Sequence, residues 1–157
     1  MTSEMHEVTS EPLQLEHVIR KVESPAAGAI TTFIGTVREW TKGRRTIYLE
    51  YQAYVPMAVA MLEQIGHEVN TRWPGTKVAI SHRIGSLNIG EAAVIIAVSS
   101  PHRRVAYEAN AYAIERIKDM VPIWKKEHWE NGEKWIGNQA GTVVYPDGQP
   151  EKEMKQT

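Results

Sequence analysis

Two lysines, Lys118 and Lys125, lie seven residues apart in a stretch that also holds Pro122 and Trp124. A proline cannot continue a helix, so Lys118 is expected in a last helical turn and Lys125 in the extended segment that follows. If the chain folds back at Pro122, the two amines come close together. Neighbouring ammonium groups and partial burial by Trp124 would then favour a neutral amine, which a lysine nucleophile or proton carrier requires. The alternative is a pair of structural cations at a helix C-terminus.

A second group of polar residues stands where the same helix should begin. Ser100 can cap the helix, and Pro101 suits its first position because the missing N–H costs nothing there. His102, Arg103 and Arg104 follow beside the unpaired N–H groups of the first turn. This end of the helix is therefore a candidate site for phosphate or carboxylate, with a solvated basic face as the alternative.

The helix between these two groups sets the distance that separates them. Its apolar residues recur close to a 3.6-residue period: Val105, Ala109, Tyr112, Ala113, Ile117 and Met120. From His102 to Lys118 the helix would extend about 24 Å, at about 1.5 Å per residue. No small metabolite bridges that distance within one protomer. Either the two ends serve different purposes, or one end faces a second copy of the chain, which predicts a homodimer with composite sites.

The remaining elements follow from periodicity and turn signals. A short helix is expected over Leu15–Val22, and a second from Pro56 to the break at Trp73-Pro74-Gly75. The expected strands cover residues 29–38, 46–54, 77–82 and 91–99, and Asn131-Gly132 predicts a closing hairpin. Helices and strands in this order predict an α+β protein with helices packed on a largely antiparallel or mixed sheet.

Two strands carry further local expectations. Gly35, inside the first strand, suggests a bulge or a close approach by a ligand or neighbouring backbone. Arg38 follows it, either as a binding residue or as an arginine at a solvated strand end. In residues 46–54, Ile47, Leu49 and Tyr51 are expected to share one face of a half-exposed strand. Residues 39–45 are expected to form a mobile loop and residues 85–90 a loop or bulged turn.

Composition limits the classes of function. The chain has 157 residues, 42% hydrophobic and 24% charged, with a net charge of −1, as in a soluble globular protein that is not a general nucleic-acid or membrane-surface binder. It has no cysteine, so disulfides, thiolate metal sites and cysteine nucleophiles are excluded. The six histidines show no compact metal spacing, and no metal site is expected.

The expected domain organisation is simple. Residues 1–12 are expected to be a flexible N-terminus, residues 13–140 one domain, and residues 141–157 a C-terminal tail. No apolar run approaches membrane-spanning length, and the first residues do not read as a signal peptide. The default expectation is therefore a cytoplasmic protein.

Several segments in order resemble the large, catalytic subunits of molybdopterin synthase, the MoaE family. They are Phe33-Ile34-Gly35-Thr36-Val37-Arg38, Leu49-Glu50-Tyr51-Gln52-Ala53-Tyr54, Pro56-Met57-Ala58, Trp73-Pro74, His82-Arg83-Ile84-Gly85-Ser86-Leu87, Gly90-Glu91, Ser99-Ser100-Pro101-His102-Arg103 and Val121-Pro122-Ile123-Trp124-Lys125-Lys126-Glu127. Each segment alone is weak evidence for the family. The whole set in this order, over roughly residues 28 to 136, is highly specific for it.

The resemblance implies an α/β-hammerhead fold with an additional small antiparallel β subdomain, and a homodimer of large subunits. A small ubiquitin-like sulfur-carrier subunit would dock on each copy, giving a heterotetramer. The implied reaction converts cyclic pyranopterin monophosphate into molybdopterin by adding two dithiolene sulfurs. The sulfur would arrive as a thiocarboxylate on the small subunit's C-terminus, with no permanently bound cofactor, and the absence of cysteine fits that division of labour.

The resemblance also assigns roles by position. It implies that Lys118 and Lys125 are the catalytic lysines. The implied substrate-binding residues are Thr36, Val37, Arg38, His102, Arg103, Lys118, Lys125, Lys126 and Glu127. Two other classes compete: a non-catalytic module that binds a phosphate ligand or a partner on the same fold, and a Schiff-base lysine enzyme acting on a phosphorylated carbonyl compound.

Overall fold

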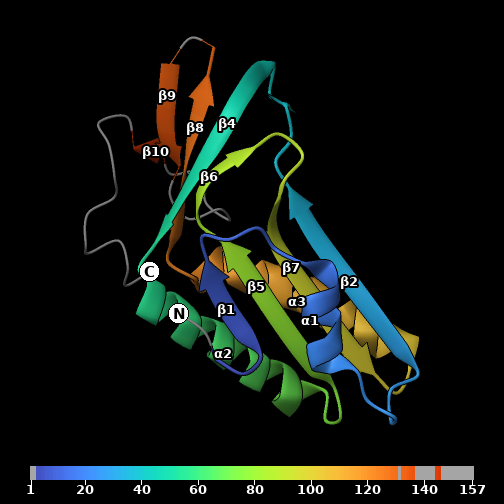
Figure 1. Cartoon of the computed structure of the whole chain (residues 1–157). Coiled ribbons are helices and arrows are strands. Elements are labelled where there is room, and N and C mark those ends of the chain that lie inside the picture. The colour runs from blue at the N-terminus through green and yellow to red at the C-terminus, as the bar shows by residue number, and fades with distance from the viewer. Residues whose placement is uncertain (1–2, 131, 137–143, 146–157) are drawn as a thin grey trace.

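The computed structural model describes residues 3–130, 132–136 and 144–145, which form an α+β fold as expected (Figure 1). In chain order its elements are β1 (His6–Thr9), α1 (Leu15–Val22), β2 (Ala29–Thr36), β3 (Trp40–Thr41), β4 (Arg44–Ala53), α2 (Val55–Arg72), β5 (Lys77–Arg83), β6 (Gly85–Asn88), β7 (Ala92–Ser100), α3 (Arg103–Met120), β8 (Ile123–Trp129), β9 (Gly132–Ile136) and β10 (Val144–Tyr145).

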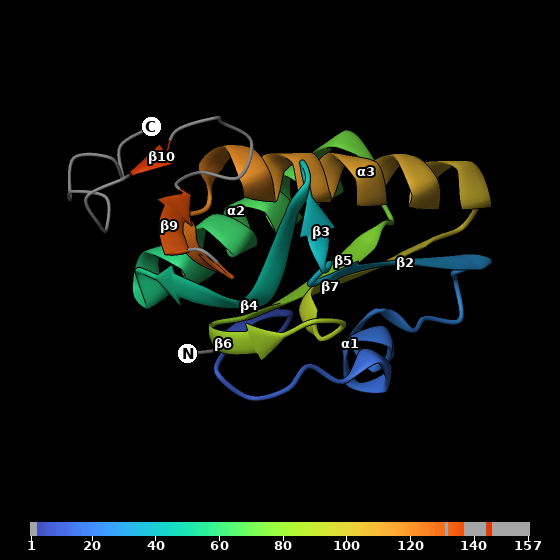
Figure 2. The same ribbon diagram turned by 90° about the horizontal axis from the view of Figure 1, so that it is seen from above.

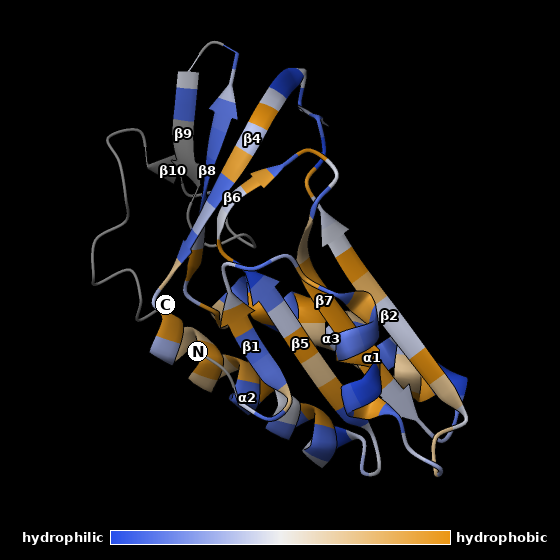
Figure 3. Ribbon diagram, in the orientation of Figure 1, coloured by the Kyte–Doolittle hydropathy of each residue, from blue (hydrophilic) through white to orange (hydrophobic). Residues whose placement is uncertain are grey.

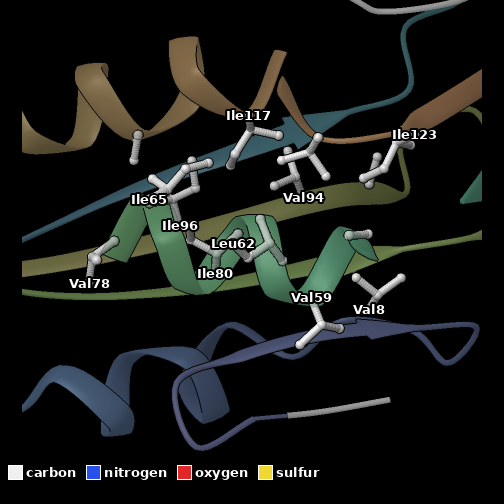
Figure 4. Close-up of a cluster of buried hydrophobic side chains, with 14 of the residues drawn as sticks. Val8, Val59, Leu62, Ile65, Val78, Ile80, Val94, Ile96, Ile117 and Ile123 are labelled. Carbon is white, nitrogen blue, oxygen red and sulfur yellow. The ribbon is translucent and has the colours of Figure 1, made fainter. Parts of the chain in front are cut away.

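A four-stranded sheet in the order β1-β5-β7-β2 carries all three of these helices. The β1–β5 pair is parallel, and the other two pairs are antiparallel. Helices α2 and α3 cover one face of the sheet, and α1 covers the other (Figure 2). The larger core lies under α2 and α3, where Leu62 and Ile65 of α2 face Ile80 and Ile96 of the sheet (Figure 4). The smaller core lies under α1.

A second sheet, antiparallel throughout, stands at one end of the first. Its order is β10-β9-β8-β4-β3, and β6 also pairs with β4. Figure 1 shows it rising from the end of the four-stranded sheet, and Figure 3 shows β8 mostly hydrophilic in colour while β7 is mostly hydrophobic. Strand β8 therefore presents polar residues, whereas β7, an inner strand of the first sheet, presents mostly apolar ones.

Some expectations from the sequence are wrong, because strand pairing depends on distant segments. The N-terminal residues 6–9 are not loose: they form β1 against β5, with His6 and Val8 buried. Residues 85–90 contain β6, and residues 39–45 contain the short strand β3. Strand β10 lies in the expected tail, while residues 137–143 and 146–157 lie outside the described part of the chain.

Helix α3 ends as expected and begins two residues later than expected. Its last residue is Met120, just ahead of Pro122. The strand β7 continues through Ser100, which is buried and pairs with Ala29, so Ser100 cannot cap the helix. The residue at the N-cap position is His102, and its side chain makes no capping hydrogen bond.

Strand β4 departs from simple alternation near its start. Its pairing with β8 shifts register between Thr46 and Tyr48, which is a β-bulge at Ile47. The bulge turns Ile47 outward, where it is 51% exposed, whereas Leu49 and Tyr51 are buried. The expectation that Ile47, Leu49 and Tyr51 share one face was therefore wrong for Ile47.

Candidate active site

A cavity of about 370 Å³ opens where the two sheets meet at the C-terminal end of α3. It is lined by residues of β2, β4, β5, β7, α3 and β8, and of the segment between β2 and β4. One part of the wall is apolar and continues the main core, through residues such as Val94 and Ile117 (Figure 4). The other part carries the charged side chains of Arg38, Lys118 and Lys125 together with Glu127.

Helix α3 brings Lys118 to the cavity. The cavity face of the last turns of the helix consists of Ile114, Ile117 and Lys118, as expected for residues three and four apart. The helix stops at Met120, and the chain turns through Val121 and Pro122 into β8. The turn at Pro122 expected from the sequence thus returns the chain to the same cavity.

Strand β8 brings Lys125 and Glu127 to the cavity. Because side chains alternate along a strand, these two residues face the cavity while Lys126 lies on the opposite face of β8. The Lys125 amine (Nζ) lies 3.8 Å from Oε1 of Glu127, a long ion pair between largely buried side chains. The Lys126 Nζ instead lies 2.7 Å from Oε1 of Glu133.

Burial lowers the pKa of Lys125 below its ordinary value. The Glu127 carboxylate opposes this effect, and the cations of Arg38 and Lys118 add to it. The net direction is downward, so more of the Lys125 amine is neutral near pH 7 than in an exposed lysine. Such an amine is suited to proton transfer or nucleophilic attack, as the sequence suggested.

Two further cavity residues, Tyr51 and His82, were missed as site residues by sequence reasoning. Tyr51 pairs directly with Lys125 across β4 and β8, and its ring meets that of His82 edge-on at 5.3 Å. Burial and Glu127 raise the pKa of Tyr51 to about 12, and burial lowers the pKa of His82 to about 4, so both are neutral near pH 7. The signal that could have found Tyr51 is its place on the buried face of β4.

The His82 ring also has a defined tautomer. Its Nδ1 lies 2.9 Å from the carbonyl oxygen of Arg83, which can only accept a hydrogen bond. Nδ1 therefore carries the proton, and Nε2 keeps its lone pair. Since His82 lines the cavity, its neutral ring offers a hydrogen-bond acceptor without a charge.

Strand β2 reaches the cavity through a bulge at Gly35, as its sequence predicted. The pairing of β2 with β7 shifts register between Gly35 and Thr36. A Cβ added at Gly35 would lie 2.8 Å from Cγ1 of Val94, so the group that approaches Gly35 closely is a side chain rather than the expected ligand or backbone. Beyond the bulge, Thr36 and Arg38 line the cavity, and Arg38 Nε donates a hydrogen bond of 3.1 Å to Thr41 Oγ1.

The other residues expected at the site lie elsewhere in this single chain. Val37 is buried, with its side chain in the main core, and Lys126 faces away from the cavity. His102 and Arg103 are exposed at the opposite end of α3, and neither lines the cavity. Five of the expected residues therefore come together: Thr36, Arg38, Lys118, Lys125 and Glu127.

These groups define what the cavity can do. Its cations can bind an anion and stabilise negative charge that develops on an oxygen atom during acyl transfer. Its buried amine can move a proton. In the described residues, no group of three or more His, Cys, Asp or Glu side chains could hold a metal ion. None of the helices in that same part of the chain is long and apolar enough to span a membrane.

Comparisons of the sequence with known proteins agree with one another. The family model for the MoaE protein matches residues 8–120. The molybdopterin synthase catalytic subunit of Bacillus subtilis (strain 168) is 66% identical over 148 residues, covering 94% of this chain and 94% of that protein. The protein of the same name from Halalkalibacterium halodurans is 57% identical over 156 residues, covering 99% of this chain and all of that protein.

Solved structures agree with the sequence relatives. The crystal structure of molybdopterin synthase from Staphylococcus aureus is 56% identical, with a TM-score of 0.83, over 87% of this chain and 99% of that chain. A chain in the complex of subunits 1 and 2 of molybdopterin-converting factor from Helicobacter pylori 26695 shares the fold at 20% identity, with a TM-score of 0.66, over 82% of this chain and 88% of that one.

Proposed function

This chain belongs to the MoaE family, and we propose that it is the catalytic subunit of a molybdopterin synthase, which adds two dithiolene sulfurs to cyclic pyranopterin monophosphate. The observation that carries the proposal is the convergence of Lys118, Lys125 and Arg38 on one partly apolar cavity. The cations match a phosphate ester and a thiocarboxylate, and the apolar wall matches a ring system.

The sulfur comes from a second protein. The chain has no cysteine and hence no thiol of its own to carry sulfur. The Helicobacter pylori structure of the same fold is a complex of two subunits of molybdopterin-converting factor. We assign the donor role to a small ubiquitin-like subunit, whose C-terminal thiocarboxylate enters the cavity beside Lys118 and Lys125.

Each sulfur transfer replaces a carbon–oxygen bond of the pterin side chain by a carbon–sulfur bond. The thiocarboxylate sulfur first bonds to a side-chain carbon while a carbon–oxygen bond of that carbon breaks, and the oxygen leaves with a phosphate ester or as water. The product of this step is a thioester between the pterin side chain and the donor tail. Water then attacks the thioester carbonyl, the carbon–sulfur bond to the donor tail breaks, and the tail leaves as a carboxylate. A cationic group beside the carbonyl stabilises the oxyanion of the second step, and the Lys125 amine, whose pKa is lowered by burial, can accept the proton that water loses.

A reconstituted reaction tests this proposal. The chain is mixed with a thiocarboxylated small subunit and the cyclic pterin phosphate, and molybdopterin is measured after oxidation to a fluorescent derivative. The wild-type chain should form molybdopterin, whereas Lys118→Ala should nearly abolish turnover and leave the circular dichroism spectrum unchanged. Product from Lys118→Ala at the wild-type rate would overturn the catalytic assignment, and binding without turnover by the wild type would favour the non-catalytic module.

We infer further that two copies of the chain complete each site. Strand β2 is the end strand of the four-stranded sheet in the described residues. Its outward residues Ile30 and Ile34 are each 42% exposed, which is unusual for isoleucine at a solvated edge. An exposed edge strand with apolar side chains is suited to pairing with another copy of itself about a two-fold axis.

The direction of β2 explains what such pairing would achieve. The strand begins beside the start of α3, where the Gly28 N–H donates to the Ser100 carbonyl, and it ends at the cavity beside Thr36. Its eight residues extend about 24 Å, roughly the length of helix that separates His102 from Lys118. Antiparallel pairing of two β2 strands would therefore bring His102 and Arg103 of one copy to the cavity of the other.

Two experiments test the composite site. Mixing inactive Lys118→Ala and His102→Ala chains should restore activity in mixed dimers, because one site in each mixed dimer would then be intact. Absence of recovery in confirmed mixed dimers would exclude shared sites. Separately, Ile30→Glu with Ile34→Glu should convert the dimer into a monomer by light scattering and lower turnover, and an unchanged mass would exclude β2 as the interface.

A further inference from the structure

A polar cluster ties α2 to α3 on the side of α3 that faces away from the cavity. The Glu68 carboxylate of α2 accepts a hydrogen bond of 2.7 Å from the Tyr112 hydroxyl. It also accepts bonds of 3.0 Å from Nε and 3.2 Å from Nη2 of Arg116. Gln64 adds a fourth hydrogen bond of 3.2 Å from within α2. One carboxylate therefore holds two residues of α3 that lie one helical turn apart.

This cluster differs from an ordinary surface ion pair. The side chains of Glu68 and Arg116 are only 24% and 31% exposed, and Arg116 binds through two nitrogens. The hydrogen bonds from Arg116 and Tyr112 hold the pKa of Glu68 at about 2, despite its partial burial. The bidentate geometry fixes orientation as well as distance, since the planar guanidinium must align with the carboxylate plane.

The cluster lies next to the catalytic end of the helix. Arg116 is two residues from Lys118, about 200° around the helix, so the two side chains leave the helix on nearly opposite sides. Ile114 and Lys118 face the cavity, whereas Tyr112 and Arg116 face α2. Any rotation of the last turns of α3 would displace the cavity-facing pair and the α2-facing pair together.

A small rotation is enough to matter. At the roughly 6 Å outer radius of a helix, a turn of about 10° moves a side-chain atom by about 1 Å. A misplacement of that size at a reacting group can cost roughly 100-fold in rate. The packing of Ile117 in the core limits such rotation, but an apolar contact does not fix an angle as a bidentate hydrogen bond does.

We propose that Glu68 is a positioning residue of the sulfur-transfer site: by holding Tyr112 and Arg116 it sets the rotation of α3 and hence the place of the Lys118 amine. The proposal rests on the proposed function for its effect on rate, but the placement of Lys118 can be observed without turnover. Glu68 does not touch the cavity, and its role is exerted entirely through α3.

The test compares Glu68→Ala with a matched control on the same helix. Glu108→Ala also removes a carboxylate from an ion pair, with Arg104, but that pair is largely exposed and lies near the other end of α3. We expect Glu68→Ala to lower kcat roughly 10- to 100-fold while KM for the pterin phosphate changes less than about threefold. Glu108→Ala should keep kcat within about twofold of the wild type.

A spectroscopic measurement separates positioning from loss of stability. In protein labelled with ¹³C at the lysine Cε, the Lys118 signal is assigned from the Lys118→Arg spectrum. Glu68→Ala should shift that signal, and Glu108→Ala should not. If Glu68→Ala fails to fold, Glu68→Gln takes its place, because the amide keeps one acceptor oxygen but turns an N–H towards Arg116 Nη2.

The outcomes are distinct. An unmoved Lys118 signal in a folded Glu68 variant would overturn the positioning role, and so would equal shifts in the Glu68 and Glu108 variants. A wild-type chain that makes no molybdopterin would instead overturn the proposed function. The lysine signal would still report whether Glu68 positions α3.

Discussion

Replacing Gly35 by alanine should damage both the core and the active site, because the new methyl group has no room. An ideal Cβ at this position lies 2.8 Å from Cγ1 of Val94 and 3.3 Å from Cε2 of Phe33. Carbon atoms in contact prefer about 3.5–4.0 Å, so Val94 or the backbone of β2 must move by roughly 0.7 Å or more. Val94 cannot easily turn aside, since it is β-branched and 7% exposed.

The expected magnitude follows from two opposing contributions. Overpacking of this kind costs about 1–3 kcal/mol. Alanine also restricts the unfolded chain, which stabilises by about 0.4–1 kcal/mol where the native backbone is compatible, as it is here because Gly35 is not among the residues with positive φ. The net expectation is a loss of about 1.3 kcal/mol, within a range of about 0–2.6 kcal/mol. Each kcal/mol lost should lower Tm by roughly 2–4 °C.

A double-mutant cycle with Val94→Ala isolates the clash. Val94→Ala alone removes two methyl groups and should cost about 1.6 kcal/mol at about 0.8 kcal/mol each. In the double variant the obstructing Cγ1 is gone, so the loss should be smaller than the sum of the single losses by about 1–2 kcal/mol. Urea unfolding of the four proteins measures these values, and turnover should fall in Gly35→Ala because Thr36 follows it into the cavity. A Gly35→Ala chain as stable as the wild type, with losses that simply add, would refute this account.

Three other predictions concern charge. Activity should rise with pH as the Lys125 amine loses its proton. Glu127→Gln should move that rise to lower pH, because Glu127 raises the pKa of Lys125. A pH–rate profile that is the same in Glu127→Gln and the wild type would contradict this prediction. Lys126→Ala should lower turnover much less than Lys125→Ala, because Lys126 faces away from the cavity. Equal losses of turnover in the same assay would show that Lys126 contributes to the site. Burial lowers the pKa of His6 and of His82 from 6.5 to about 4. Between pH 6.5 and about pH 4 the unfolded chain therefore binds more protons than the folded chain. The free energy of unfolding should fall as the pH drops through that range. His6→Gln should weaken that dependence in urea titrations, and an identical dependence would show that His6 does not contribute.

Local signals in the sequence predicted much of the fold and part of the site. The breaks at Trp73-Pro74-Gly75 and Pro122 gave the ends of α2 and α3 closely, because proline and glycine act on the backbone at their own positions. Gly35 indicated the bulge in β2 for the same reason. The turn at Pro122 was enough to expect Lys118 and Lys125 near each other.

Features that depend on distant partners could not be predicted in this way. The residues of β1 look polar and loose in isolation, and become a strand because β5 offers hydrogen bonds and α2 buries His6. His82 carries no local sign of a site, and the alternation that places Tyr51 on the buried face of β4 does not show that this face meets a cavity. They meet because β4 of the second sheet and β5 of the first both line the cavity, and the pairing of β4 with β8 sets Tyr51 opposite Lys125.

Two of the strands that bring polar residues to the cavity, β2 and β4, carry a β-bulge at the point where they reach it. With regular alternation, Ile47 would share the face of Leu49 and Tyr51 and place an isoleucine beside the cations. The bulge instead puts Thr46 in the cavity wall and leaves Ile47 outside. On β2 the bulge follows Gly35 and leads to Thr36 in the same wall. A strand whose apolar residues alternate as in a core strand can thus line a polar cavity. The reason is that the one residue inserted at a β-bulge reverses which side chains face the interior beyond the bulge.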